Sequence, residues 1–125
     1  MDTLMTQPWY TIREMYARSV SGWPPLGAML ALIERIEQSQ LNALFGWKSM
    51  HDLYIVQTPV TYPYNGPCLR ISPQSDGTIE FRYIDTSIAD KQWSRVVPGP
   101  AAFDRLVGFT TQLHWFTVPD AAPAS

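Results

Sequence analysis

Three arginines lie on or beside a stretch of alternating apolar and polar residues, and they are the groups best suited to bind an anion. They are Arg70, Arg82 and Arg95. A guanidinium group presents planar N–H donors that match a carboxylate or a phosphate, so a cluster of arginines favours a small anionic ligand. Glu80 and Asp85 could instead pair with these arginines from within the protein, in which case the face is solvated and binds nothing.

Aromatic residues also suggest a function, because they fall mainly in loops and at the ends of the expected elements. Exposed tryptophan and tyrosine side chains are enriched where proteins bind one another. The same side chains could instead close the open ends of a two-layer core. The residues concerned are Trp23, Trp47, Trp93, Trp115, Tyr62 and Tyr64.

A small-ligand site would combine arginines and aromatic residues in one pocket. A curved sheet covered by helices can leave an apolar cavity with a few polar groups on its wall. Convergence of the candidate side chains on one cavity would favour a ligand-binding protein or an enzyme, whereas scatter over a convex surface would argue against both. The candidate lining residues are His51, Tyr62, Tyr64, Arg70, Arg82, Trp93 and Arg95.

No residue pattern predicts a catalytic centre, a metal site or a cofactor. His51 and Asp52 are the only adjacent base and carboxylate, and His114 is too distant in sequence to form a zinc pattern with His51 and Cys68. Cys68 shares a predicted face with Arg70, and a neighbouring cation favours the thiolate. A buried, unreactive thiol is nevertheless the usual state of a lone cysteine. We therefore expect a binding protein rather than an enzyme.

The composition is that of one small domain with little charge. The chain has 125 residues, of which 46% are hydrophobic and 16% are charged, and its formal net charge is -2. The low charge indicates apolar surface that a partner or a second copy of the chain covers. The slightly acidic balance argues against nucleic acid as that partner. We predict a single domain over 1–125 with disordered ends at 1–7 and 117–125.

Cysteine usage and hydropathy predict the location of the protein. A single cysteine excludes an internal disulfide bond and favours a reducing compartment. The first ten residues show no signal-peptide pattern. The longest apolar run, near 26–33, is far shorter than the ~20 residues that a membrane span needs. We expect a cytoplasmic protein that does not bind membranes, and the composition suggests a bacterial source.

Residues 68–84 are predicted to form a central β-hairpin, because apolar and polar residues alternate on both sides of a turn signal. The favoured loop is the three residues 75–77, with Gly77 in a left-handed conformation. This loop length places Ile71 opposite Phe81, so both strands direct their apolar side chains to one face. A two-residue loop would split that face.

The same register makes two of the arginines direct neighbours. Arg70 opposes Arg82 on the polar face, at a cost between a few tenths and ~1 kcal/mol for like charges in opposed positions. Whether Arg95 joins them depends on how the last strand pairs. In that strand Trp93, Arg95 and Val97 share one face by their spacing.

The remaining elements follow from apolar periodicity and from proline and glycine positions. Expected helices are Trp9–Arg18, Pro25–Leu44 and Ala101–His114, and expected strands are Asp52–Thr58, the two hairpin strands and Gln92–Val97. Gly46 is expected to end the second helix, Trp47–Met50 to form a link, and the proline-rich residues 58–67 to form a stiff loop or an edge segment. The predicted fold is a two-layer α+β domain with an antiparallel sheet of about four strands, packed against an N-terminal helical pair and a C-terminal helix.

Two functional hypotheses follow. The leading one is a non-enzymatic protein-interaction module, such as an adaptor, an inhibitor or an immunity-like protein, with self-association as a homodimer through a sheet edge or through the helical pair. The alternative is a small-ligand-binding protein or an enzyme with a pocket between sheet and helices. The candidate pocket residues separate the two, because only the second hypothesis requires them to converge.

Overall fold

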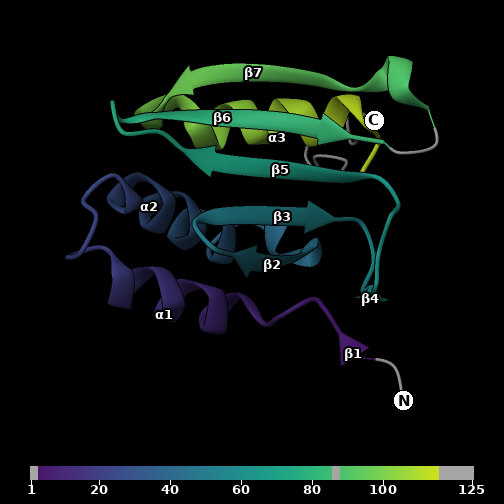
Figure 1. Ribbon diagram of the computed structural model, residues 1–125. Helices are drawn as coiled ribbons and strands as arrows, with labels where there is room; N and C mark the ends of the chain where they lie inside the picture. Colours follow the sequence, from purple (N-terminus) through teal and green to yellow (C-terminus); the bar gives the residue numbers. More distant parts are fainter. Residues whose placement is uncertain (1–2, 86–87, 116–125) are drawn as a thin grey trace, which may run out of the picture.

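The computed structural model describes residues 3–85 and 88–115, and within these ranges the fold is α+β (Figure 1). The α-helices are α1 (Trp9–Ser19), α2 (Leu26–Glu37) and α3 (Ala102–Gln112). The strands are β1 (Thr3–Leu4), β2 (Phe45–Ser49), β3 (Asp52–Val56), β4 (Thr61–Tyr62), β5 (Cys68–Pro73), β6 (Thr78–Ile84) and β7 (Trp93–Pro98). Three short 3-10 segments are η1 (Gln40–Ala43), η2 (Ala89–Lys91) and η3 (Gly99–Ala101). None of the described helices is both long and apolar enough to cross a membrane.

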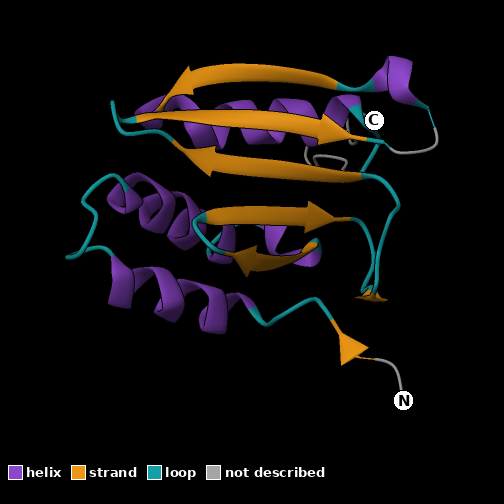
Figure 2. Ribbon diagram, viewed as in Figure 1, coloured by secondary structure: helices purple, strands orange, loops and turns teal. Residues whose placement is uncertain are grey.

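Five strands form one antiparallel sheet in the order β2-β3-β5-β6-β7, and β1 pairs with β4 in a small separate sheet. Figure 2 shows α2 and α3 behind the large sheet, with α1 alongside α2. The α+β class, the antiparallel sheet and the helices at both ends of the chain are confirmed. The sheet has one strand more than the expected four.

The central hairpin has the predicted register. Ile71 lies opposite Phe81, and Arg70 lies opposite Arg82. The loop is residues 75–77, closed where the Gln74 N–H donates to the Thr78 carbonyl at 2.9 Å. Gly77 has φ +89°, a left-handed conformation that glycine adopts without a steric cost. Loop length therefore sets which side chains face the core.

The core lies between the helices and the face of the sheet that carries Ile71 and Phe81. Both side chains are fully buried, and the Phe81 ring lies 5.0 Å from that of Phe109 in α3. Burial of such a side chain contributes roughly 1.5–3 kcal/mol, which makes this face the main source of stability. Other buried members of this core include Ile12, Tyr16, Leu26, Met29, Ile33, Ile36, Leu53, Ile55, Leu69, Ile79 and Leu106.

The extra strand, β2, lies where the sequence predicted the end of a helix and a link. Helix α2 ends at Glu37, because Ser39 turns extended and its side chain accepts the Leu41 N–H at 3.1 Å. Leu41 and Leu44 remain buried through η1, so the apolar stripe continues although the helix does not. The prediction of one helix from Pro25 to Leu44 is therefore wrong beyond Glu37.

Gly46 lies inside β2 and does not end a helix. A Cβ atom on Gly46 would lie 2.7 Å from the Tyr54 carbonyl oxygen and 3.1 Å from the Trp9 ring. Trp9 also donates from its indole N–H to the Leu44 carbonyl at 3.1 Å. The glycine is therefore required mainly by the close approach of the Tyr54 backbone in β3, and the Trp9 ring of α1 restricts the same space further.

Residues 3–7 are ordered, whereas 1–7 was expected to be disordered. Thr3 pairs with Tyr62, so β1 forms a small antiparallel ribbon with β4, which lies within the proline-rich segment. The Gln7 N–H then donates to the Gly46 carbonyl at 2.8 Å and covers part of the β2 edge. The other sheet edge, β7, has no such cover among the described residues. The expectation for 117–125 lies outside the described residues.

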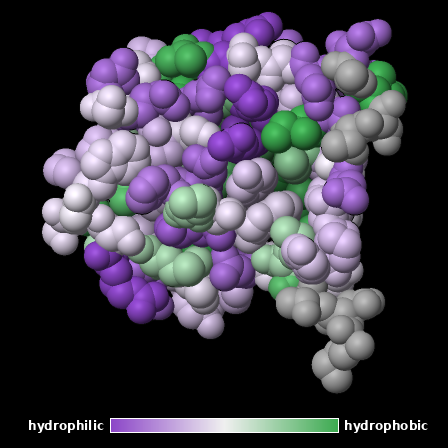
Figure 3. Space-filling model, in the orientation of Figure 1, coloured by the Kyte–Doolittle hydropathy of each residue, from purple (hydrophilic) through white to green (hydrophobic). Residues whose placement is uncertain are grey.

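None of the described α-helices covers the second face of the sheet (Figure 2). Near the ends of β3 and β5, the buried residues Trp47, Val56 and Cys68 form a small cluster beneath Val60 and Tyr64. Figure 3 shows this face with hydrophilic residues gathered over the middle of β5 and β6 and hydrophobic ones toward the right-hand end of these strands. The open face is thus partly apolar and partly charged.

Candidate functional site

A concave pocket of about 500 Å³ lies between the edge strand β7 and helix α3. It combines two arginines, one amide, two aromatic rings and one aliphatic side chain. This mixture of cationic donors and apolar wall is typical of a site that holds an anionic group. The pocket, called the basic pocket below, is lined by Trp93, Arg95, Arg105, Phe109, Gln112 and Leu113.

The floor of this basic pocket is a pair of aromatic rings. The Trp93 and Phe109 ring centroids lie 4.8 Å apart. The guanidinium carbon of Arg95 lies 5.6 Å from the Trp93 ring, and that of Arg105 lies 5.2 Å from the Phe109 ring. Each cation–π contact contributes about 0.5–1 kcal/mol at an exposed site. These contacts keep both guanidinium groups over the floor.

Strand pairing and helix periodicity bring these residues together. Arg95 lies opposite Phe81 in the β6–β7 register, so it shares the helix-covered face of the sheet. It stays exposed because β7 is the last strand. Arg105, Phe109 and Gln112 are four and three residues apart in α3, a spacing that puts them on one helix face. The pocket therefore exists only once α3 packs beside β7.

Neither arginine of the basic pocket forms an ion pair with any described residue. Arg95 donates from Nη1 to the backbone carbonyl of Ser94 at 2.8 Å. Two cations in one pocket without a carboxylate partner produce a local positive potential in a chain whose net charge is -2. An incoming carboxylate or phosphate would find donors free to bind it.

The other two predicted arginines lie on the opposite, open face. Arg70 forms a salt bridge to Asp52, with 2.6 Å between Nη2 and Oδ2, and this hydrogen-bonded contact raises the pKa of Arg70. Arg82 lies 3.7 Å from Glu80. Both of these arginines have an acidic neighbour on the same face. They do not join Arg95.

The remaining candidates lie in three further places. Tyr62 is exposed in β4, and Tyr64 packs edge-on against Trp47 while its hydroxyl donates to the Pro67 carbonyl at 2.7 Å. His51 lies in the β2–β3 turn, with its ring 4.8 Å from that of Trp23. Of the seven predicted residues, the basic pocket thus contains Trp93 and Arg95 alone.

Cys68 lies in an environment that disfavours the thiolate. Burial raises the pKa of the Cys68 thiol to about 11, against a smaller lowering effect of Arg70. The neighbouring cation is thus outweighed by burial, and the thiol stays protonated at neutral pH. No group of three or more acidic, histidine or cysteine side chains within 3–85 and 88–115 could hold a metal ion. At neutral pH, Cys68 therefore offers no thiolate nucleophile.

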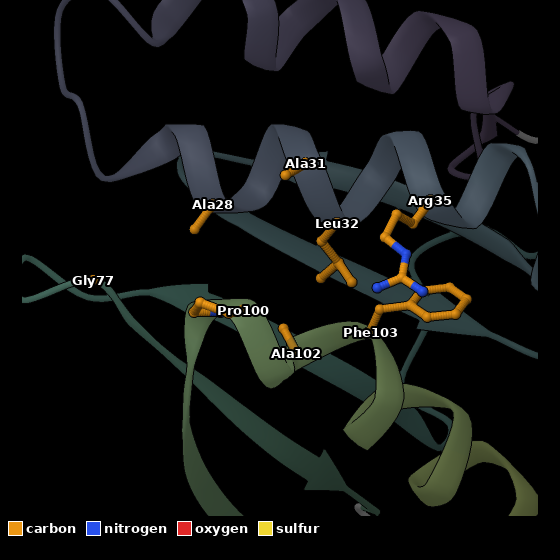
Figure 4. A pocket seen from close by; sticks show the side chains of 9 residues that line it. Ala28, Ala31, Leu32, Arg35, Gly77, Pro100, Ala102 and Phe103 are labelled. Atoms are coloured by element: carbon orange, nitrogen blue, oxygen red, sulfur yellow. The ribbon is translucent and has the colours of Figure 1, made fainter.

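A second hollow, of about 310 Å³, lies between α2 and the η3–α3 segment (Figure 4). Its wall is mostly apolar, with small residues such as Ala28 on one side and Pro100 on the other. The only charged side chain among its lining residues is Arg35, which stacks on Phe103 with 4.2 Å from its guanidinium carbon to the ring. This apolar groove lacks the paired donors of the basic pocket.

Half of the basic pocket could not be inferred from sequence patterns. The inward stripe that periodicity predicts for the last helix is Phe103, Leu106, Val107, Thr110 and Leu113, and only Leu113 of these lines the pocket. The available signal was the spacing of Arg105, Phe109 and Gln112 along one helix face. This spacing predicts a binding site only when an edge strand is known to lie beside that helix face.

Comparison of the chain with family models, with curated proteins and with solved structures finds no match. The functional interpretation therefore depends on two features of the structure itself. These are the basic pocket and the open edge of β7 next to it.

Proposed function

We propose that this chain is a non-enzymatic protein-interaction module that binds its partner along the open edge of the sheet. The observation that carries this proposal is the position of β7, which is the last strand of the sheet. An edge strand presents unpaired N–H and C=O groups that can add a strand from another chain. Val96 in β7 is 61% exposed, so an apolar side chain is available beside these groups.

The opposite edge supports the choice of β7. At β2, the Gln7 N–H donates to Gly46 and the Trp9 side chain packs over the same glycine. The chain itself thereby shields one edge, whereas no strand within 3–85 and 88–115 pairs with the other edge, β7. A protein that needs no partner usually blunts both edges, because an open edge promotes association.

The non-enzymatic part of the proposal is supported by the chemistry of the described residues. The Cys68 thiol is held protonated by burial. Tyr16 is the most buried tyrosine, and burial raises the pKa of its hydroxyl. This hydroxyl donates to the His51 carbonyl at 2.9 Å, which is a structural contact. These groups give no acid–base pair facing a shared cavity.

A second candidate function is the binding of a small anionic ligand. The basic pocket favours it, because Arg95 and Arg105 line one cavity and neither pairs with a carboxylate of the described part of the chain. The two candidates share these residues and differ in whether the anion is free or belongs to a protein segment. Backbone pairing at β7 distinguishes them, since a small anion does not need it.

The setting of the module is also a proposal. We infer a cytoplasmic protein from the single cysteine, and a bacterial source from the composition. The net charge of -2 makes nucleic acid an unfavourable partner. The partner is then another protein or a second copy of the chain.

The test is stoichiometric association of the full-length chain. We expect affinity purification from its native cells to recover one defined protein in equimolar amount, and the purified pair to reassemble in sedimentation velocity. Sedimentation of the isolated chain over a wide concentration range tests self-association. A strict monomer that recovers no stoichiometric partner would contradict the proposal.

A further inference from the structure

We propose that the segment bound at β7 is an acidic β-strand, which pairs with the edge through Val96 and places a carboxylate between Arg95 and Arg105. This inference rests on the proposed function and names the chemistry of its partner. It joins two observations that are independent of each other. One is the direction of the backbone groups of β7, and the other is the basic pocket.

Hydrogen bonding in the hairpin sets the direction of the β7 backbone. The Thr78 carbonyl accepts from the Gln74 N–H in the segment that follows β5, so this carbonyl points toward the β5 side of β6. Hydrogen-bonded pairs alternate along antiparallel strands, so Ile79 and Val97 form a hydrogen-bonded pair between β6 and β7. The neighbouring residue, Val96, therefore directs its N–H and C=O to the open edge.

The hydrogen bond of the Arg95 side chain agrees with this direction of the β7 backbone groups. It also lies where an added strand would bind. The Arg95 Nη1 donates to the Ser94 carbonyl at 2.8 Å. Ser94 is two residues from Val96, so its carbonyl also points outward by the same alternation. The guanidinium group thus occupies a position where the N–H of an added strand would lie. When a strand binds, Arg95 can exchange this neutral acceptor for a carboxylate, which is a stronger partner.

The geometry of a sixth strand predicts which of its residues meet the basic pocket. Directly opposed residues share a face, and neighbouring strands lie about 4.8 Å apart. A residue opposed to Arg95 would therefore lie over α3, next to Arg105 and Gln112. A glutamate at that position reaches both guanidinium groups. The residues before and after it lie on the other face, beside the exposed Val96.

A second copy of the chain fits this edge less well. Antiparallel pairing of two β7 strands would bring two basic pockets to one junction. Four arginines would then meet, and neither Arg95 nor Arg105 has a carboxylate among the described residues to offset them. Like charges that face each other across strands are destabilising. Charge complementarity favours an acidic segment of another protein.

The test uses a capped peptide with the six-residue length of β7, alternating valine and glutamate, and a matched peptide with lysine in place of glutamate. Binding to the full-length chain is followed by fluorescence polarisation at low salt. We expect the glutamate peptide to bind at least about tenfold more tightly than the lysine peptide, since each charged hydrogen bond contributes about that factor.

Two pairs of variants locate the peptide. Val96→Pro removes the outward N–H without removing a bond to β6, and Val96→Ala keeps it. We expect the proline variant to weaken binding about tenfold relative to the alanine variant. Arg105→Ala should weaken binding by a similar factor, whereas Arg18→Ala, on the exposed face of α1, should not. Circular dichroism checks that each variant is folded.

Charge reversal keeps the proposal testable if Val96→Pro does not fold. A chain with Arg95→Glu and Arg105→Glu should prefer the lysine peptide. Equal binding of both peptides by the wild-type chain would overturn the proposal, as would equal binding by Arg105→Ala and Arg18→Ala. Binding of free acetate or benzoate with the same affinity as the peptide would overturn it too, and would assign the pocket to small anions. If the glutamate peptide does not bind but purification still recovers a stoichiometric partner, the acidic-strand proposal is wrong and the proposed function stands.

Discussion

Arg70 and Arg82 lie directly opposite each other across β5 and β6 on the open face of the sheet. Asp52 in β3 lies on the other side of Arg70 and forms a salt bridge to it at 2.6 Å. The carboxylate therefore offsets a repulsion that the hairpin register imposes. Asp52, Arg70 and Arg82 form a charged row across three strands, and their energetic coupling can be measured.

We predict that Asp52→Asn lowers the free energy of unfolding by about 1 kcal/mol, because Arg70 loses its salt bridge while Arg82 still lies opposite it. Arg82→Thr should raise stability by a few tenths of a kcal/mol, because removal of the like charge opposite Arg70 outweighs loss of the exposed 3.7 Å pair with Glu80. In the double variant the loss from Asp52→Asn should shrink. Urea denaturation of the four chains measures this coupling. Additive effects would show that the row is not coupled.

Gly77 sets the register on which this row depends. Its φ of +89° is unfavourable for any side chain, so we predict that Gly77→Ala lowers the free energy of unfolding by about 1 kcal/mol. Gly108 is the matched control, because it lies inside α3 with open space where a Cβ would be. Gly108→Ala should raise stability by up to about 1 kcal/mol. Opposite signs in thermal unfolding are expected, and a neutral Gly77→Ala would contradict the register argument.

The hairpin was predictable because its information is local. Alternation over 68–84 identifies two strands, and a loop of three residues is the one that keeps Ile71 and Phe81 on one face. The same logic made Arg70 and Arg82 neighbours. No residue outside the hairpin is needed to reach these conclusions.

Strand β2 and the basic pocket were not predictable, because their signals are non-local. The buried residues Leu41 and Leu44 extend the helical stripe of α2 through η1, and Gly46 imitates a helix end. Gly46 is explained by the Tyr54 carbonyl oxygen in β3 and, less directly, by the Trp9 ring in α1, and both lie in other elements. Likewise, Arg95 and Arg105 line the same pocket only after α3 folds back beside β7.

Substitution of Gly46 tests this long-range contact. We predict that Gly46→Ala lowers the free energy of unfolding by about 1–3 kcal/mol, because its Cβ would lie 2.7 Å from the Tyr54 carbonyl oxygen. Trp9→Phe should not rescue it, since the clash with the backbone remains. Chemical denaturation of the single and double variants measures both effects. A stable Gly46→Ala chain would show that β2 and β3 adjust at this point more easily than the structure indicates.

Cys68 gives the protein a pH dependence in the alkaline range. Burial raises the pKa of its thiol from 9.0 to about 11, so the unfolded chain loses the proton first as pH rises. The stabilisation is fully present below pH 9 and is lost progressively as pH rises toward 11. Each pKa unit of this difference corresponds to about 1.4 kcal/mol, so the two units set an upper limit of about 2.7 kcal/mol on the stability that the thiol contributes.

We therefore predict that the free energy of unfolding falls between pH 9 and pH 11 in the wild-type chain and falls less in Cys68→Ala, which has no thiol to titrate. The native thiol should also react slowly with a disulfide reagent at about pH 8, and rapidly once urea unfolds the chain, because the thiolate is the reactive species. Unfolding curves at several pH values, with the variant as control, measure the first effect. Rapid labelling of the folded chain under the same conditions would show that Cys68 is accessible and ionised, and it would reopen the question of a nucleophile on the open face.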